Sequence, residues 1–204
     1  NMVIIHLQHP EQHEFAFAQL SDRAVSASWK RGNWGEISRL ARSDGAILLI
    51  PTRDVLLIQT TLVTTSQRQL KQALPYALEE NLVDDPAEQH FVWQAQADNP
   101  NVLDVAVIKR ETLKAWMALL RKHKIRARTI LPDVFALPVS GEPNVPTIMQ
   151  HSGQALVRTG PYSGFSSVSG AVPLLIDNLF DDEEAEEVQE QEPSVWLYAD
   201  QQED

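Results

Sequence analysis

The stretch of sequence that decides the fold reads Leu70-Lys-Gln-Ala-Leu-Pro-Tyr-Ala-Leu-Glu-Glu-Asn-Leu82, and it continues through Asp84-Asp85-Pro86 to His90-Phe91. Its apolar residues recur with the 3.6-residue period of an amphipathic helix, while the charged and amide side chains lie largely off that stripe. The pattern predicts a helix over residues 66–82 with one buried face and with Ser66 as its cap. Pro75 removes one amide donor inside the helix and should bend it or reset its first turn.

The segments on either side of this helix predict a split βαβ subdomain, which we assign to residues 52–130. Their order is β-α-β-β-α-β, as in the ferredoxin-like arrangement, where two helices pack on one face of a four-stranded antiparallel sheet. The expected strands cover residues 55–63, 90–95, 102–109 and 126–131, and the second helix covers residues 111–123.

The residues before this insertion predict a sheet of their own. Apolar residues alternate with polar ones in a hairpin around Ser21-Asp22-Arg23. The unbroken apolar run 45–50 is typical of a central strand covered on both faces. The expected strands are 3–7, 14–20, 24–29 and 45–50, and the expected helix is 33–42.

The chain is expected to return to this first layer after the insertion. Asp133 is a candidate helix cap and Pro138 a candidate stop, so residues 2–51 and 131–140 together form the first lobe. Residues 141–146 have the composition of a linker. The rest repeats the opening in miniature, and we assign residues 145–204 to a second, incomplete lobe. Its expected strands are 147–150, 155–158, 165–168 and 195–198, its expected helix is 171–180, and Ser152-Gly153 forms a turn.

The charge of the chain is concentrated in one segment. Of the net charge of −11, eight negative charges lie in residues 181–192, which leaves −3 for the remainder. So dense a block of like charge is a solvated loop or linker, or else an acidic docking segment. The densest basic cluster, at 109–128, falls largely on a predicted helix whose charges can face water, so nucleic acid is not an expected partner.

Composition indicates a folded, cytosolic chain. The 204 residues are 43% hydrophobic, which is enough for real cores. No stretch approaches the roughly 18 apolar residues that cross a bilayer, and the N-terminus lacks the layout of a secretory signal. The absence of cysteine fits a reducing compartment without proving one. We expect Asn1 to be a cloning remnant and the natural protein to start at Met2 and continue past Asp204.

The central stretch also carries a family resemblance. Leu74-Pro-Tyr-Ala-Leu-Glu-Glu80, the pair Asp84-Asp85 and the following His90-Phe91 resemble the cytoplasmic domain of type II secretion system protein L. From physics alone, a bent helix followed by a turn explains the same residues. The repeated lobe opening around an inserted subdomain is similar to the actin-like superfamily, in which two RNase H-like lobes flank a nucleotide cleft. The two resemblances agree on a mixed α/β, actin-like fold.

The resemblance implies a role in protein transport at the bacterial inner membrane. It implies an adaptor that holds the N-terminal domain of the secretion ATPase on the cytoplasmic side and links ATP hydrolysis to pseudopilus assembly. It further implies a homodimer, contacts with other inner-membrane secretion components, and a single transmembrane helix with a periplasmic domain beyond Asp204.

Nucleotide chemistry is not expected, although the superfamily suggests it. Actin-like ATPases hold ATP with a strand-turn-strand that carries an acid and a glycine in each lobe. The corresponding positions here are His6 with Gln8 and His151 with Gly153, so both acids are missing. No Gly-x-x-x-x-Gly-Lys loop is present either. Two rival interpretations stay open: an active actin-like ATP-binding protein of a pilus or cell-division system, and an unrelated two-domain α/β binding protein.

Other candidate sites have simpler explanations. His6, His9, His13 and Glu14 contain metal-ligand types, but a strand and a proline-containing loop should not bring them together. The glycine-rich segment 160–170 is explained by turns, and no nucleophile elbow is present. We therefore expect no enzyme, cofactor or metal. A polar rim around the end of the helix 66–82 suits partner recognition, although a solvated face explains it equally well; its candidate residues are Tyr76, Glu79, Glu80, Asp84, Asp85 and His90.

Overall fold

The computed structural model describes residues 2–20, 29–41, 45–63, 66–142, 145–175 and 196–199. The chain divides into two compact units, Asn1–Asp133 and Val134–Asp204. The first unit holds a five-stranded and a three-stranded sheet, and the second holds a four-stranded sheet. Helices and strands are both present, which confirms the expected mixed α/β class. Within the described ranges, no helix combines the length and the apolar character needed to span a bilayer.

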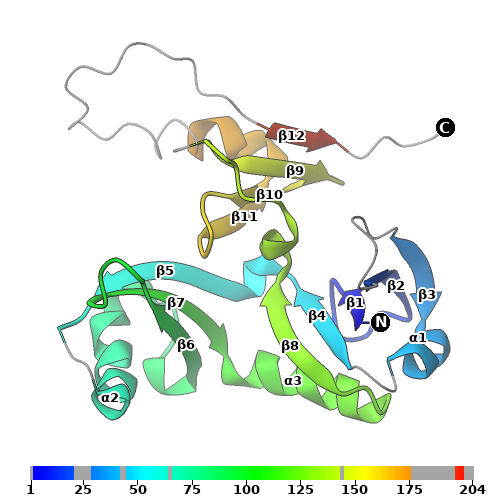
Figure 1. Ribbon diagram of the computed structural model, residues 1–204, viewed down its shortest axis with the longest axis horizontal. Helices are drawn as coiled ribbons and strands as arrows, with labels where there is room; N and C mark the ends of the chain where they lie inside the picture. The colour runs from blue at the N-terminus through cyan, green and yellow to red at the C-terminus, as the bar shows by residue number, and fades with distance from the viewer. Residues whose placement is uncertain are drawn as a thin grey trace. The chain divides into compact units, whose positions relative to one another are not determined.

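The five-stranded sheet of unit 1 has the order β3-β2-β1-β4-β8 (Figure 1). The first three strands pair antiparallel, whereas β4 runs parallel to both β1 and β8. The predicted hairpin is present, but its second strand begins at Lys30; residues 24–28 lie outside the described part. The elements are β1 (Met2–His6), β2 (Glu14–Leu20), β3 (Lys30–Asn33), α1 (Trp34–Leu40), β4 (Ala46–Ile50) and β8 (Ala127–Pro132).

One face of this sheet forms the main core of unit 1. Every second residue of β1 and β4 points into it, so Val3, Ile5 and Leu48 are fully buried. Helices α1 and α3 (Arg110–Lys122) cover that face, because Ile37 and Trp116 belong to the same buried cluster. The first helix begins at Asn33, whose side chain accepts a hydrogen bond from the Glu36 amide.

The three-stranded sheet has the order β5-β7-β6 and is antiparallel throughout. Helix α2 covers one face, where Leu70, Leu74 and Leu78 pack against Leu103 and Val105 of β7. The pattern of buried residues matches the amphipathic stripe that the sequence predicts. The elements are η1 (Thr52–Asp54), β5 (Val55–Thr61), α2 (Gln67–Ala77), η2 (Glu79–Asn81), η3 (Pro86–Glu88), β6 (Gln89–Ala95) and β7 (Val102–Lys109).

Helix α2 is shorter than the predicted helix over 66–82. Ser66 occupies the cap position, but its side chain makes no capping hydrogen bond. Pro75 lies in the last part of the helix and removes the amide that would bond the carbonyl of Lys71, so this turn is held by fewer bonds. The chain then tightens into η2, where the Asn81 amide bonds the Leu78 carbonyl in the 3₁₀ pattern.

The predicted four-stranded split βαβ sheet is wrong in its second half. The expected fourth strand, β8, does not join β5 but pairs with β4 in the five-stranded sheet. Likewise α3 does not pack beside α2, because Trp116 and Leu120 are buried in the main core instead. Ile125, which lies between the two elements, and Ile130 of β8 pack in the same core. Residues 134–140 belong to the second compact unit. The expected domain boundaries themselves stay a prediction.

Unit 2 repeats the strand order of the first sheet. Its order β11-β10-β9-β12 has the same pairing as β3-β2-β1-β4, with two antiparallel pairs and then a parallel one. Residues 172–175 are helical, whereas the rest of the predicted helix 171–180 and the acidic segment 181–192 lie outside the described residues. The elements are η4 (Asp133–Ala136), β9 (Thr147–His151), β10 (Gln154–Arg158), β11 (Gly164–Val168), η5 (Ser169–Ala171) and β12 (Trp196–Ala199).

The Arg158 side chain on β10 links the first residues of unit 2 to the four-stranded sheet through hydrogen bonds. Its guanidinium donates hydrogen bonds to the carbonyls of Phe135, at 2.9 Å, and of Leu137. It also donates to the carbonyls of Gly160 and Pro161 and lies 5.2 Å from the centre of the Phe135 ring. Because one side chain satisfies four carbonyls, the turn after β8 is held to β10 without regular secondary structure.

Asp133 is predicted as a helix cap, but its side chain connects three segments of unit 1 through hydrogen bonds. Its Oδ1 accepts hydrogen bonds from the amide of Thr52, at 2.9 Å, and from the Thr52 hydroxyl, at 2.6 Å. Its Oδ2 lies 3.1 Å from Nε2 of His6. Burial raises the pKa of the Asp133 carboxyl, but the hydrogen bonds from His6 and Thr52 outweigh it and hold that pKa below 3.8. The carboxylate thus ties the end of β8 to η1 and β1.

Leu74→Ala should destabilise unit 1 by about 2–5 kcal/mol, because it leaves a cavity under the three-stranded sheet. Urea unfolding followed by circular dichroism measures the change. Gln72→Ala on the exposed side of the same helix is the matched control and should change the free energy of unfolding by less than about 0.5 kcal/mol. Equal effects of the two substitutions would contradict the assigned buried face.

Asp133→Asn should reduce stability at neutral pH by about 1.5–3 kcal/mol, because it removes the charge that strengthens these hydrogen bonds. The folded-state pKa is below the ordinary value of 3.8, so the carboxylate stabilises the fold above that value and loses this effect as the pH falls through the folded-state pKa. The difference between wild type and variant should therefore shrink on acidification. Urea unfolding over a pH series measures it, with exposed Asp98→Asn as the control; a difference that does not change with pH would contradict the assignment.

Candidate partner interface

The position expected for a nucleotide in the first lobe is filled by a network of polar side chains. It lies where the parallel strands β1, β4 and β8 end at their carboxyl side, the usual ligand position in such sheets. Nε2 of His6 lies 2.8 Å from Nε2 of Gln8 and 3.1 Å from Oδ2 of Asp133. Arg53 donates hydrogen bonds to the backbone carbonyl of Gln8, at 2.6 Å, and to its side-chain oxygen. The side chains at this edge thus hydrogen-bond to one another.

Sequence reasoning missed the acid at this edge. Asp133 directly follows the apolar strand β8, and this position at the carboxyl end of a strand next to β4 brings its carboxylate to His6. The signal was available in the order of residues, since an acid after an apolar strand often lies at a ligand edge. The prediction that residues 126–131 pair within the smaller sheet conceals this position.

The corresponding turn of the second lobe is a tight hairpin. Ser152 and Gly153 have φ angles of 49° and 75°, so both adopt the left-handed conformation of a two-residue type I′ turn. The turn joins β9 directly to β10, with His151 paired to Gln154. An added Cβ at Gly153 would meet no atom within 4 Å, so the backbone angle and not the space favours glycine there.

The histidines of the first hairpin do not gather around a common point with Glu14. Among the residues that the structure describes, no group of three or more histidine, aspartate or glutamate side chains could hold a metal ion. That His6, His9 and His13 bind no metal stays a prediction from the sequence.

The predicted rim surrounds the carboxyl end of α2 and the two 3₁₀ turns that follow. Tyr76 is 79% exposed, and Glu79, Glu80 and Asp85 are exposed as well. Residues 79–88 hold five acidic side chains and no basic one. We call Tyr76, Glu79 and Glu80 the α2 rim, because these three point to solvent from one helix end.

Two other predicted residues make local contacts, and the third is partly buried. The Asp84 carboxylate forms an ion pair of 2.9 Å with Lys109, and Asp85 accepts a hydrogen bond of 2.8 Å from the Ala87 amide at the start of η3. His90 is half-buried on β6, where burial lowers its pKa and the cations Arg110 and Lys71 lower it further. Asp84 and His90 are thus partly buried, whereas Asp85 is exposed but already accepts a local hydrogen bond.

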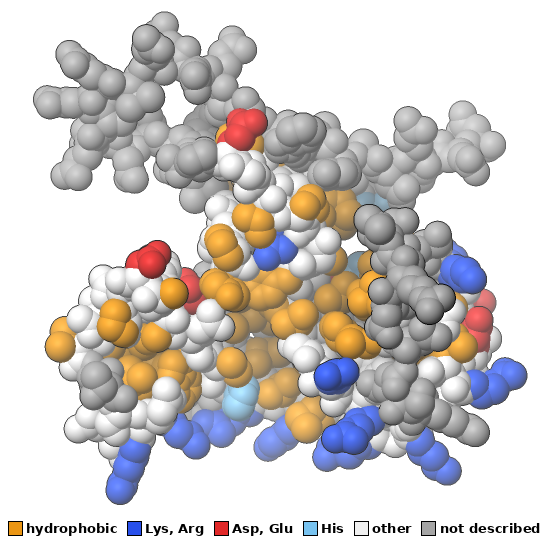
Figure 2. Space-filling model, in the orientation of Figure 1, with side chains coloured by type: hydrophobic (Ala, Val, Ile, Leu, Met, Phe, Trp, Pro, Cys, Tyr) orange, Lys and Arg blue, Asp and Glu red, His pale blue; other side chains and the backbone are white. Residues whose placement is uncertain are grey.

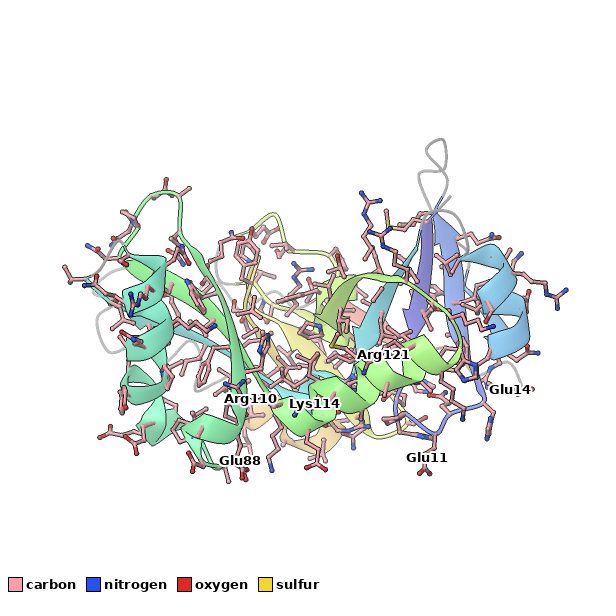
Figure 3. All side chains as sticks on the ribbon, turned by 90° about the horizontal axis from the view of Figure 1, so that it is seen from below. Glu11, Glu14, Glu88, Arg110, Lys114 and Arg121 are labelled. Atoms are coloured by element: carbon pink, nitrogen blue, oxygen red, sulfur yellow. The ribbon has the colours of Figure 1, made fainter. Side chains whose placement is uncertain are left out.

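A basic row runs along the exposed side of α3, beside the acidic turns. Arg110, Lys114 and Arg121 lie close to one line on this helix, and Glu88 lies near its first turn (Figure 3). Residues 110–128 hold seven Lys and Arg against one Glu. Figure 2 shows Lys and Arg side chains gathered along this margin of unit 1. The surface of unit 1 thus carries neighbouring acidic and basic regions.

A shallow groove of about 490 Å³ opens between the end of β5 and α2. It carries no ionisable side chain among its lining residues, which distinguishes it from the charged surfaces around it. The lining residues are Leu62, Val63, Gln69, Gln72 and Ala73.

Comparison with known proteins identifies the family. Residues 10–201 match the family described as type II secretion system, protein L. The curated proteins named type II secretion system protein L from Dickeya chrysanthemi and Klebsiella pneumoniae are 37% and 33% identical over 94 and 104 residues. These matches cover 46% and 51% of this chain but 23% and 26% of the relatives, so the chain spans about a quarter of their length.

Solved structures support the fold. The cytoplasmic domain of EpsL, described as an inner-membrane component of the type II secretion system of Vibrio cholerae, has a TM-score of 0.75 at 19% identity and covers 99% of this chain and 83% of that one. A chain of the PilM-PilN type IV pilus biogenesis complex has a TM-score of 0.58 at 11% identity, covering 82% of this chain and 61% of that one. The expected actin-like fold is thereby confirmed. Since one family model accounts for nearly all of the sequence, and the curated relatives and the EpsL structure agree with it, the chain belongs to the protein L family of the type II secretion system.

Proposed function

We propose that this chain is a non-catalytic adaptor that recruits the secretion ATPase to the inner membrane through that enzyme's N-terminal domain. The observation that carries the proposal is the family match over residues 10–201. The α2 rim supplies a surface of suitable chemistry, because it combines one exposed aromatic side chain with two exposed carboxylates.

The adaptor works by position and makes or breaks no bond. Membership of the secretion machinery and the likeness to the cytoplasmic domain of an inner-membrane component support a place on the cytoplasmic side of that membrane. A folded surface that binds the ATPase there couples ATP hydrolysis in one protein to pseudopilus assembly through another.

Binding of a partner to the α2 rim should cost little conformational entropy. Tyr76 contributes a large side chain with few rotatable bonds, so ordering it on binding loses little conformational entropy. Asp84 with Lys109 and Asp85 with the Ala87 amide already hold the turns that carry the rim. The carboxylates of Glu79 and Glu80 favour a partner that presents cations, and such charges act mainly on specificity and association rate.

Isothermal titration of this chain with the N-terminal domain of the secretion ATPase should show saturable one-to-one binding. Replacing Glu79 and Glu80 together by lysine reverses two rim charges and should weaken binding by about tenfold or more, which corresponds to 1.4 kcal/mol. Glu11→Lys combined with Glu14→Lys makes the same change in net charge on exposed positions of the first hairpin and should leave affinity unchanged. Absence of heat and of co-elution with folded protein would overturn the adaptor, whereas equal losses in both double variants would overturn the rim alone.

A second candidate function is ATP binding, which the fold likeness to PilM favours. We expect none, because His6 and His151 stand where the acids should be and side chains already bond to one another at the first position. Magnesium and ATP should leave the melting temperature unchanged in a thermal-shift assay. A ligand at 100 times its Kd stabilises the folded state by about 2.7 kcal/mol, so a rise of several degrees would reinstate the ATP-binding interpretation.

A further inference from the structure

The basic row on α3 belongs to a block of cations that have no acidic partner among the described residues. Of the 17 Lys and Arg residues in the chain, seven lie in residues 110–128, beside the single acid Glu111. Within the described ranges none of the seven forms an ion pair, whereas Lys109 directly before them pairs with Asp84. Their positive charge is therefore available to a partner.

Two of these cations lie where helix electrostatics disfavours them. Arg110 is the first residue of α3, and the amino end of a helix carries a partial positive charge that repels a cation. Lys114 follows four residues later on the same side of the helix, and like charges at this spacing repel each other. The stability of α3 alone would favour acids at both positions. Sequences break such local rules mainly where a surface serves a function.

The basic row also has an apolar centre. Met117 lies three residues after Lys114 and four before Arg121, so the helical period places it on their side of α3. Its side chain is 44% exposed, and Ala118 next to it is exposed as well. A methionine adapts its shape to an apolar partner, and a small alanine lets another helix approach closely. The row thus offers apolar contact between its charges.

Acidic residues bound the row at both ends. Figure 3 shows Glu88 beyond one end of the row and Glu11 and Glu14 beyond the other. The hairpin loop reaches the second end because Trp34 stacks on His123 with 4.3 Å between the ring centres. The same indole donates a hydrogen bond of 3.0 Å to the backbone carbonyl directly after Glu11. The positive surface is therefore limited in length.

We propose that the basic row binds an acidic amphipathic helix of a partner protein, about three turns long. Arg110 and Arg121 are eleven residues apart, which corresponds to about 16 Å of helix. A helix of that length places carboxylates over the cations and an apolar side chain over Met117. The negative surface of a membrane extends well beyond the row and would also face the acids at its ends, so the charges favour a protein segment.

Fluorescence anisotropy with a labelled synthetic peptide tests the proposal. The designed peptide has about 18 residues, with leucine spaced by three and four positions, glutamate on both sides of that stripe and alanine elsewhere. A scrambled peptide has the same composition without the stripe. The 204-residue chain should bind the designed peptide saturably below about 1 mM and about fivefold more tightly than the scrambled one. Binding should weaken as salt rises from about 0.1 to 1 M, because the screening length falls from about 10 to 3 Å.

Lys114→Glu combined with Arg121→Glu reverses two charges of the row and should weaken binding by at least about tenfold. Arg31→Glu combined with Arg39→Glu makes the same change in net charge at exposed positions outside the row and should change affinity by less than about twofold. Met117→Gln keeps the charge and should remove the preference for the designed peptide over the scrambled one. It also tests the surface if circular dichroism shows that the first double variant does not fold.

Absence of saturable binding to the designed peptide up to about 1 mM would overturn the proposal. Equal affinity for the two peptides, or equal losses in the two double variants, would overturn it as well. Co-sedimentation with vesicles of phosphatidylglycerol and phosphatidylcholine is the remaining measurement. Binding to these vesicles without binding to the peptide would replace the protein partner by an anionic membrane.

The basic row shares no residue with the α2 rim, so the two surfaces can be tested separately. The double variant of Glu79 and Glu80 should bind the peptide like wild type. The double variant of Lys114 and Arg121 should bind the ATPase domain like wild type. Loss of ATPase binding in that variant would assign the row to the ATPase and overturn a separate partner, whereas loss of peptide binding alone supports it.

Discussion

Burial of apolar side chains against the five-stranded sheet is the constraint on which the rest of unit 1 depends. Trp116 is 1% exposed and Ile125 is 5% exposed, both in the cluster that includes Ile5 and Leu48. Full burial of side chains of this size contributes about 1.5–3 kcal/mol each. Once α3 and the start of β8 are held there, pairing β8 with β4 follows, and the smaller sheet keeps three strands.

The same constraint determines the polar network at the end of β1. Because β8 runs parallel to β4, it delivers Asp133 to Thr52 and His6. Had β8 joined β5, that carboxylate would lie in the other sheet. The chain therefore has an acid at the carboxyl end of these parallel strands, and this acid bonds to neighbouring side chains.

The local elements could be predicted from sequence, whereas their long-range partners could not. The run 102–109 was predicted as a strand with the bounds that the structure shows, and α3 is displaced by one residue from its predicted bounds. Periodicity and capping are local signals, so they locate such elements. Which sheet β8 joins depends on competition between two apolar surfaces separated by many residues, and no local pattern encodes that. The same holds for the candidate site. The exposure of Tyr76 and Glu79 could be predicted from the helical stripe. The ion pair between Asp84 and Lys109 could not, because it depends on how distant segments pack.

The two sheets share a strand order, yet their first hairpins differ in how well they accommodate a change in loop length. Between β1 and β2 the chain has seven residues, 7–13, so the length of this loop does not by itself set the register of β2. Between β9 and β10 the type I′ turn at Ser152 and Gly153 sets the register by itself. One inserted residue there would shift β10 by one position and turn its alternate side chains to the other face. Ala155 and Val157, now buried, would face solvent, so variation in loop length among homologues should be confined to the first hairpin.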